Sequence, residues 1–480
     1  MRDAAAAREK LARHGQEHAL RFWNDLAEPD RAALLAQIDS LDLVLVDSLT
    51  QRWIRDTPAP AHFSKIDPVP VIKTSSPLSS TDQEASTAGE AALRAGRVGL
   101  VLVAGGQGTR LGFDGPKGAY PIGSVTGRTI FEFHADKIHN LQRRYGCTLP
   151  WYIMVGETNE AQTKAFFGKH GHFGLDPANI VFFTQHMMPC VSEDGKLLLE
   201  TPFRLASNPN GHGGCIPAMV ECGVIADAKR RGLDTLSYFQ VDNWAVKVAD
   251  PLFIGHHVLR NGRMSSKVCP KTEPRESVGV HCLCDGVYQV IEYTELDIYP
   301  QLLETGPGGN LIHFAGNTAI HVLSVDFVEE TNRNFANFPW HCSHKKIPYL
   351  DDSGALVKPS KNNGYKFETF VFDALQYTNH PPIVLEIGRL GEYTPTKQPT
   401  GPNSVEEAQD DMNQLWGGWL EAAGAAVKRS AGGAIISKIE ISPRFALTLD
   451  EFVERSKGHA WPKNPEALAI GPEGQILTGK

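Results

Sequence analysis

The chain has 480 residues, of which 41% are hydrophobic and 21% are charged, a composition typical of a globular protein with two or three domains. Its formal net charge of −8 argues against a general nucleic-acid surface, because phosphate backbones are bound through an excess of Lys and Arg. The N-terminal segment lacks the apolar stretch of a secretory signal, and no apolar run reaches bilayer length. Eight cysteines without a Cys-x-x-Cys pair favour reduced thiols, so we expect a cytoplasmic protein without nucleic-acid or membrane partners.

Residues 1–95 are predicted to form helices followed by a linker. Leu20, Trp23 and Leu26 recur at helical spacing within a helical pattern that reaches about Ile54. Residues 57–80 contain five prolines with scattered Ser and Thr, which is typical of a linker, and a short helix follows.

A glycine-rich loop follows the first strong strand signal. Val98–Ala104 is a continuous apolar, β-branched run, which predicts a strand buried on both faces. Ala104, Gly105 and Gly106 then begin a loop whose backbone amides can cradle phosphates. Arg110 and Lys117 add two positive charges for a polyphosphate at close range. We therefore predict a nucleoside triphosphate site.

This loop differs from three better-known phosphate loops. Arg110 and Leu111 stand where a Walker A sequence needs Lys followed by Ser or Thr. Pro116 and Pro121 prevent a helix from starting directly after the loop, as a dinucleotide fingerprint requires. The His-Arg-Asp and Asp-Phe-Gly motifs of protein kinases are missing from the sequence.

Strand and helix patterns alternate from Val98 to about residue 249, which predicts a doubly wound sheet. Ligands of such sheets bind outside the carboxyl ends of the strands. Gln185 ends one buried strand and can read a base edge through its amide. A turn containing Gly211 and His212 precedes a helix predicted over residues 217–231 and suits the other side of a nucleotide. Asp242 ends another buried strand, where it can bind Mg²⁺ shared with phosphate, or simply cap the following turn.

Three segments of the chain resemble the eukaryotic-type UDP-sugar pyrophosphorylase family, most closely its members that act on N-acetylglucosamine. They are Leu102–Gly118, Val241–Gly255, with the pattern Val-Asp-Asn-x-x-Val-Lys-Val-Ala-Asp-Pro-x-Phe-Ile-Gly, and Asp285–Tyr293. The resemblance implies an α/β fold with a Rossmann-like, doubly wound mixed sheet, as in nucleotidyltransferases and GT-A proteins. It also implies a catalytic domain over residues 96–400 and a small C-terminal domain over residues 401–480.

The resemblance implies a uridylyltransferase that joins UTP to a sugar 1-phosphate and releases pyrophosphate, with Mg²⁺ as cofactor. Arg110 and Lys117 would hold the leaving pyrophosphate, while Lys397 and Lys366 would hold the sugar phosphate. Asp242 would bind the metal ion beside the α-phosphate.

The sugar pocket is placed by the same resemblance. Residues 271–280 and 285–293 are expected to form two strands joined through an Asp-Gly turn. Glu292 and Asn317 would bind sugar hydroxyls, and Gly279 would leave space for the ring or an acetyl group.

The sequence departs from its relatives at His212, and three alternative functions stay open. His212 makes the Gly-His-Gly of UDP-glucose pyrophosphorylases, where N-acetylglucosamine enzymes carry Gly-Asn-Gly-Gly, so UDP-glucose or UDP-galactose is an alternative product. A glycosyltransferase would usually carry a second acid after Asp242, where this chain has Asn243 and Trp244. A non-catalytic UDP-sugar sensor is the third alternative. The sugar, the physiological direction and the oligomeric state are left open.

Overall fold

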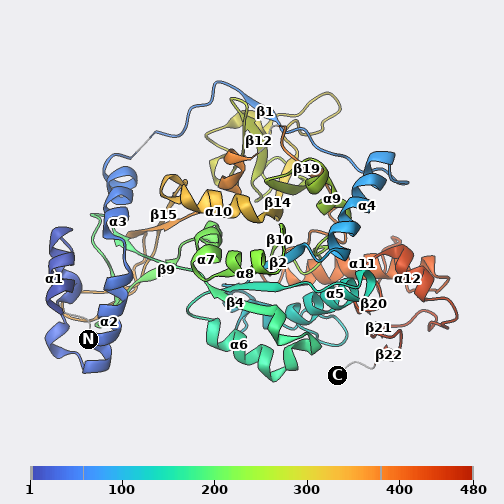
Figure 1. The fold of residues 1–480 in the computed structure, drawn as a ribbon, viewed down its shortest axis with the longest axis horizontal. Coiled ribbons are helices and arrows are strands. Elements are labelled where there is room, and N and C mark those ends of the chain that lie inside the picture. The colour runs from blue at the N-terminus through green and yellow to red at the C-terminus, as the bar shows by residue number, and fades with distance from the viewer. Residues whose placement is uncertain (1–3, 58, 379–380, 478–480) are drawn as a thin grey trace. The chain divides into compact units, whose positions relative to one another are not determined.

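The computed structural model describes residues 4–57, 59–378 and 381–477 (Figure 1). The contacts between residues divide the chain into two compact units, each assembled from three separate segments. The first unit contains Met1–His62, Gln185–Cys215 and Ala336–Asp373, and the second contains Phe63–Thr184, Ile216–Phe335 and Ala374–Lys480. The division into parts at residues 95 and 400 stays a prediction.

The first unit combines the N-terminal helices with short antiparallel strands. The helices are α1 (Ala4–Arg13), α2 (Glu28–Ser40) and α3 (Leu43–Thr50), which agrees with the predicted helical segment. Three of these strands form one sheet: β15 (His341–Lys345), β18 (Gly364–Glu368) and β6 (Val191–Ser192). The others form two-stranded pairs: β5 (Met187–Pro189) with β9 (Ser207–Pro209), β7 (Leu199–Thr201) with β8 (Arg204–Leu205), and β16 (Tyr349–Leu350) with β17 (Leu356–Val357). Apolar side chains of these helices and strands form one buried cluster.

The second unit is built on a ten-stranded mixed sheet in which β1, β12, β14, β10, β2, β3 and β4 are consecutive neighbours. Strands β10, β2, β3 and β4 are parallel, so their carboxyl ends share one edge. Strand β14 runs antiparallel to β10 and also pairs with β11 and β12. The strand bounds are β1 (Ile66–Pro68), β2 (Val98–Val103), β3 (Trp151–Val155), β4 (Ile180–Thr184), β10 (Thr235–Gln240), β11 (Met264–Pro270), β12 (Val280–Cys284), β13 (Val287–Ile291), β14 (Ala315–Ser324) and β19 (Val384–Glu386). The predicted mixed α/β class is confirmed.

The second unit also contains nine α-helices in its described part, and three short strands lie near the C-terminus. The helices are α4 (Ser80–Arg94), α5 (Ile130–Tyr145), α6 (Glu160–Lys169), α7 (Cys215–Glu221), α8 (Val224–Arg230), α9 (Pro251–Leu259), α10 (Val325–Arg333), α11 (Val405–Ala422) and α12 (Leu449–Arg455). The C-terminal strands are β20 (Lys438–Ile441), β21 (Ala467–Ile470) and β22 (Ile476–Leu477). Within the described ranges, no helix is long and apolar enough to cross a membrane.

Three local predictions were wrong. The helix expected over residues 217–231 is split into α7 and α8, because Gly223 adopts a φ of 79° between them. Residues 271–279 form a loop instead of a strand, where Thr272 bonds to the Glu276 carboxylate, and β12 begins only at Val280. The supposed linker contributes β1, which pairs with β12.

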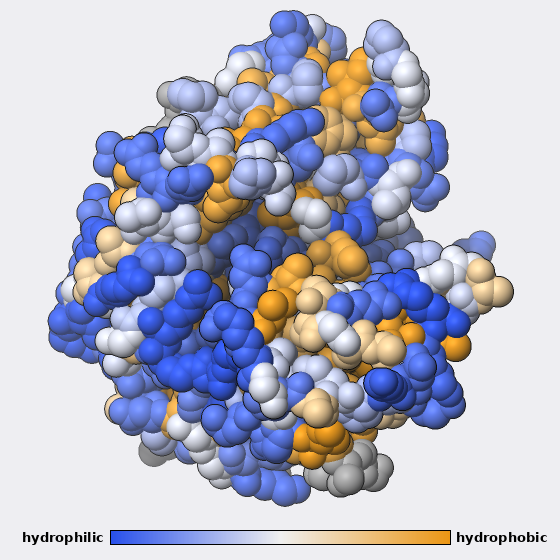
Figure 2. All heavy atoms as spheres, turned by 90° about the vertical axis from the view of Figure 1, so that its right-hand side faces the viewer, coloured by the Kyte–Doolittle hydropathy of each residue, from blue (hydrophilic) through white to orange (hydrophobic). Residues whose placement is uncertain are grey.

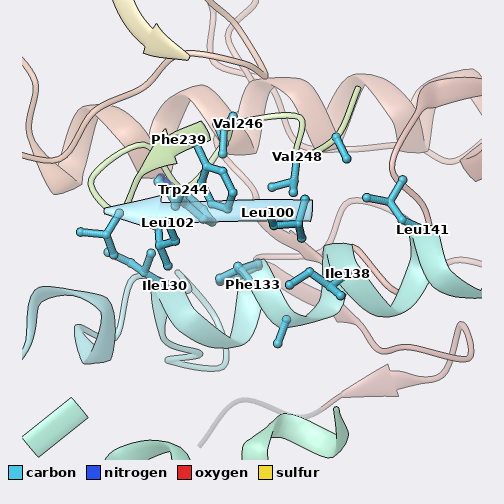
Figure 3. Close-up of a cluster of buried hydrophobic side chains, with 14 of the residues drawn as sticks. Leu100, Leu102, Ile130, Phe133, Ile138, Leu141, Phe239, Trp244, Val246 and Val248 are labelled. Atoms are coloured by element: carbon cyan, nitrogen blue, oxygen red, sulfur yellow. The ribbon is translucent and has the colours of Figure 1, made fainter. Parts of the chain in front are cut away.

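Helix α5 packs against one side of β2, the predicted buried strand. Thr129 and Glu132 form a capping box at the start of α5, and Gly146 ends the helix in a left-handed conformation with a φ of 61°. Figure 3 shows Phe133 and Leu141 of α5 in one cluster with Leu100 of β2 and with Trp244 from the segment that follows β10. This core supports the edge of the sheet from which the glycine loop and Asp242 emerge.

Helices α4 and α9 approach each other through two glycines. A Cβ atom on Gly89 of α4 would lie 1.8 Å from the carbonyl oxygen of Pro251, and one on Gly255 of α9 would lie 1.6 Å from that of Ala85. The last glycine of the Val241–Gly255 pattern therefore has a packing role.

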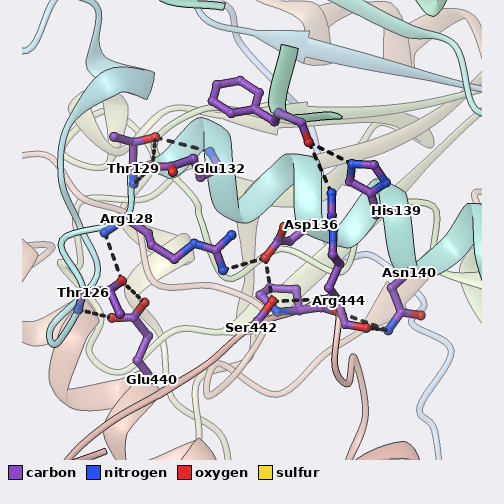
Figure 4. A network of polar contacts seen from close by, with 12 residues as sticks. Thr126, Arg128, Thr129, Glu132, Asp136, His139, Asn140, Glu440, Ser442 and Arg444 are labelled. Atoms are coloured by element: carbon purple, nitrogen blue, oxygen red, sulfur yellow. Dashed lines mark hydrogen bonds and ion pairs between the residues drawn. The ribbon is translucent and has the colours of Figure 1, made fainter. Parts of the chain in front are cut away.

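Polar contacts tie the C-terminal segment to α5 within the second unit (Figure 4). Asp136 of α5 is buried and bonds to Arg128 at 2.6 Å and to the Ser442 hydroxyl at 2.6 Å. In the segment that precedes α5, the backbone N–H groups of Val125 and Thr126 donate to the carboxylate of Glu440 on β20, at 3.1 and 2.9 Å. The segment after β20 is therefore anchored to the same core as the sheet.

Candidate active site

The glycine loop is held in shape by its own backbone and by one buried side chain. Gly108 N–H donates to the carbonyl of Gly115 at 2.8 Å, and Lys117 N–H donates to that of Gly106 at 3.1 Å. The Asn159 side chain is fully buried and donates to the carbonyls of Ala104 at 2.9 Å and Gly106 at 3.2 Å. The loop is thus preorganised at the carboxyl end of β2.

Lys117 and Asp242 lie together at the shared carboxyl edge of β2 and β10. The Lys117 ammonium lies 3.8 Å from the Asp242 carboxylate, and the two side chains are 15% and 19% exposed. Burial lowers the pKa of Lys117; the charge of Asp242 opposes this, while Lys397 and Arg110 add to it. The charges of Asp242, Lys397 and Arg110 therefore all influence Lys117, within the second unit.

The segment that carries Lys397 is paired with the segment that carries Asp242. Thr396 N–H and the Thr396 hydroxyl donate to the carbonyl of Asp242 at 2.9 and 3.1 Å. Asn243 donates to the Glu392 carbonyl at 2.8 Å and accepts from Thr394 N–H at 3.2 Å. These four contacts fix the backbone that precedes Lys397.

A buried lysine reinforces this pairing. Lys267 of β11 is completely buried, and its ammonium contacts Asp250 at 2.5 Å and Glu392 at 2.6 Å. Burial by itself would lower the pKa of Lys267, but the two carboxylates raise it, so the lysine stays charged. Glu392 also contacts Lys247 at 2.6 Å. The ion cluster joins β11, the segment after Asp242 and the segment before Lys397.

The three predicted sugar-pocket residues lie close to one another in the second unit. Asn317 N–H donates to the Gly279 carbonyl at 2.8 Å, and a Cβ atom on Gly279 would lie 3.0 Å from a carboxylate oxygen of Glu292. Asn317 Oδ1 accepts from Ala319 N–H at 3.0 Å and lies 3.2 Å from His281 Nε2. That ring nitrogen must carry the proton, because it faces an acceptor oxygen. The hydrogen bond from His281 therefore orients the amide group of Asn317.

Gln185, Gly211 and His212 meet within the first unit. Gln185 is buried and donates its amide N–H to the Gly211 carbonyl at 2.6 Å, which leaves its side-chain oxygen as the remaining acceptor. Gly211 has a φ of 84°, and a Cβ atom there would lie 2.2 Å from the Thr369 carbonyl oxygen. His212 Nδ1 accepts from Val371 N–H at 3.1 Å, so its Nε2 carries the proton of the neutral ring.

Lys366 belongs to the first unit, whereas the other three predicted cations belong to the second. It lies on β18 and is half-buried. Its positive charge lowers the pKa of Glu368 and of Cys190, although burial outweighs this effect and raises both.

Sequence reasoning missed three residues that position the site, namely Asn159, Lys267 and His281. Asn159 follows the strand beside the glycine loop, and this position at a carboxyl edge was an available signal. Lys267 lies inside the short strand β11, and a lysine inside a buried strand indicates an ion pair without naming the partners. His281 carries no comparable local signal, because its role depends on the neighbouring strand β14.

The sequence is similar to known proteins across most of its length. It is 38% identical over 407 residues to UDP-N-acetylhexosamine pyrophosphorylase-like protein 1 of Mus musculus, covering 81% of this chain and 80% of that protein. It is 31% identical over 449 residues to UDP-N-acetylglucosamine pyrophosphorylase of Saccharomyces cerevisiae, covering 88% of this chain and 93% of that protein.

The fold is similar to that of the uridine diphosphate N-acetylglucosamine pyrophosphorylase from Trypanosoma brucei, with a TM-score of 0.81, 24% identity and 98% coverage of each chain. Residues 47–370 match the sequence pattern of the family described as UTP--glucose-1-phosphate uridylyltransferase. Sequence similarity over these residues and over the full-length relatives shows that the chain belongs to this uridylyltransferase family, named UDPGP.

Proposed function

We propose that this protein forms a UDP-N-acetylhexosamine, with N-acetylglucosamine as the sugar, and pyrophosphate from UTP and the sugar 1-phosphate. The observation that carries the proposal is the position of Lys117 at the carboxyl edge of the parallel strands, where it lies 3.8 Å from Asp242 and within electrostatic range of Arg110 and Lys397. A glycosyltransferase or a UDP-sugar sensor would have little reason to keep Arg110, Lys117 and Asp242 together. The names of the relatives, which specify N-acetylated sugars, support the choice of sugar.

In this reaction an oxygen of the sugar 1-phosphate attacks the α-phosphorus of UTP. The new phosphorus–oxygen bond forms as the bond between the α- and β-phosphates breaks, and pyrophosphate leaves with the bonding electrons. The attacking oxygen is already ionised, so no general base is required. Lys117 and Arg110 hold the leaving pyrophosphate and Lys397 holds the incoming phosphate, and positioning with charge neutralisation supplies most of the rate enhancement.

Mg²⁺ is part of the proposal, and the chemistry of Asp242 fits it. Mg²⁺ is commonly held by one or two carboxylates together with substrate phosphates. In the described part of the chain no group of three or more His, Cys, Asp or Glu is placed to hold a metal ion by itself, which suits an ion that binds together with UTP. When bound, Mg²⁺ would neutralise charge that develops on the α-phosphate. Chelation is then expected to stop turnover and leave the fold intact.

The residues of the first unit keep the roles that the family resemblance implies, each to be tested by substitution. Gln185, Gly211 and His212 are proposed to contact the nucleotide, and Lys366 to bind phosphate. Cytoplasmic location is also proposed, supported by eight cysteines that are all free.

The decisive experiment is pyrophosphate release from UTP and Mg²⁺ with each of four sugar 1-phosphates. Release with N-acetylglucosamine or N-acetylgalactosamine 1-phosphate, and little with glucose or galactose 1-phosphate, is the expected result. Preference for glucose or galactose would show that His212 marks the specificity of a UDP-glucose type enzyme. Binding of UDP-sugar without any pyrophosphate release would overturn the enzymatic proposal.

A further inference from the structure

The second unit contains a cavity behind the segment that follows Asp242. Its volume is about 410 Å³, and helices α4, α5 and α11 and residues 443–449 contribute to its walls. This volume is within the range of small-molecule sites. Figure 3 shows Phe133, Leu141, Trp244 and Val246, all of which line the cavity, in one cluster. Figure 2 looks onto the side of the molecule where α11 and α12 lie in Figure 1, and apolar side chains are exposed there between hydrophilic ones.

The walls are mostly apolar and aromatic. Trp244, Trp416 and Trp419 contribute three indole rings, and Phe133 and Leu415 add apolar surface. Trp244 is 2% exposed, and among the described residues its indole N–H has no hydrogen-bond partner. A buried donor without a partner is costly, so an acceptor from a bound molecule would stabilise it.

The charges that line the cavity are unbalanced. The two acids are already paired, Glu90 with Arg94 at 2.9 Å and Asp250 with Lys267 at 2.5 Å. Buried Lys137 and exposed Arg144 also line it, and among the residues described no carboxylate lies within ion-pair distance of either. A bound anion would complement these two cations.

Lys137 connects the cavity to the backbone beyond Asp242. It is buried, and its ammonium donates to the carbonyls of Trp244 and of Val246, the latter at 2.9 Å. Burial lowers the pKa of Lys137 to about 7, as expected for an ammonium group held by neutral carbonyls alone. A ligand acid beside Lys137 would strengthen its charge and its hold on both carbonyls.

We infer that this cavity is a second ligand site, built for a small organic anion with an apolar, ring-sized body, and that its occupation orders the Trp244–Val248 segment. The acidic group would lie between Lys137 and Arg144, and the apolar body would lie against the indole rings. The site is separate from the glycine loop, and the inference does not depend on which sugar the protein uses.

Binding can be tested on the full chain with 8-anilinonaphthalene-1-sulfonate and its uncharged analogue N-phenyl-1-naphthylamine. Because three indoles line the cavity, excitation of tryptophan should give energy transfer to bound sulfonate. The signal should saturate at one sulfonate per chain. Lys137→Met should weaken sulfonate binding about tenfold or more and leave binding of the uncharged analogue unchanged. Ser86→Phe, which fills the cavity from α4, should weaken binding of both probes.

Lys457→Met is the matched control, because Lys457 is an exposed lysine outside the cavity. Ser86→Phe retains Lys137, so the test remains valid if Lys137→Met does not fold. Equal sulfonate binding by the wild type and Ser86→Phe, or equal affinity for the two probes in the wild type, would overturn the inference.

The effect on the backbone is measured by hydrogen exchange without any activity assay. Saturation with the sulfonate should slow exchange of the Trp244–Val248 amides several-fold and leave those of α10 unchanged. Unchanged exchange over Trp244–Val248 at saturation would refute the coupling.

Discussion

Asn159 is fully buried, and both ends of its amide group are occupied by the backbone around the glycine loop. It donates to the Ala104 and Gly106 carbonyls, and it accepts from Gly156 N–H at 2.8 Å. Asn243 does the same for the segment before Lys397. Charged side chains in this protein are therefore aimed by neutral, buried amides, whose hydrogen bonds are costly to break.

Arg110→Ala and Lys117→Ala should each lower kcat/KM for pyrophosphate formation by a factor on the order of 10² to 10³, because each removes a charge that we propose stabilises the transition state. Steady-state kinetics with UTP and N-acetylglucosamine 1-phosphate measure the change. Lys457→Ala removes an exposed lysine elsewhere and should leave the rate unchanged. Near-normal turnover in either loop variant would refute the proposed chemistry.

His281→Phe should raise KM for the sugar 1-phosphate about tenfold, because the Asn317 amide loses the donor that orients it. Burial lowers the pKa of His281 to about 4, so the ring is neutral and acts through its N–H at physiological pH. KM for UTP should stay constant, and His281→Gln, which restores an N–H donor, should recover much of the loss. Equal increases in both KM values would instead indicate a general structural defect.

At the scale of elements, helix α9 is positioned by contacts at its N-terminus and in its middle. Asp250 caps its N-terminus and contacts Lys267, and Gly255 permits its close approach to α4. A buried pair between His256 and Asp82, 3.0 Å apart, adds a polar contact between the same two helices. The packing of α4 on α9 therefore supports the ion cluster that joins the Asp242 and Lys397 segments.

Gly255→Ala should lower the free energy of unfolding by at least 1–3 kcal/mol, the typical cost of overpacking, because the added methyl group would overlap the Ala85 carbonyl. Chemical denaturation measures the change. Gly168→Ala in α6 is the matched control: a Cβ atom there meets nothing within 4 Å, so it should stabilise the helix by about 0.5–1 kcal/mol. Equal effects of the two substitutions would contradict the proposed packing constraint.

At the scale of the whole molecule, each unit has its own buried apolar clusters. Leu34, Val46 and Phe367 belong to the cluster of the first unit, and Leu102 and Ile138 belong to that of the second. Units with separate cores commonly unfold in separate steps.

Calorimetry should therefore resolve two unfolding transitions. Leu34→Ala should lower the midpoint of one transition, and Ile138→Ala should lower the midpoint of the other, since each truncation typically costs 2–5 kcal/mol in its own core. A single transition that both substitutions shift equally would show that the units unfold together.

Local sequence by itself determined the strand and glycine loop at residues 98–106, helix α5 and the acid at the end of β10. Burial patterns, helix caps and turn residues act over a few positions, so a short window contains the information. The family was also recognisable from the sequence, because its longest motifs are contiguous. The roles of the individual site residues stay predictions.

Tertiary structure alone decided which distant segments became neighbours. It placed Thr396, the residue before Lys397, against the backbone of Asp242, paired Lys267 with Asp250 and Glu392, aligned His281 with Asn317, and assembled each unit from three segments. Ile66–Pro68, inside the supposed linker, also became a strand, because its backbone pairs with that of β12. These outcomes depend on burial and hydrogen-bond partners that are remote in the chain, and no local pattern specifies a remote partner.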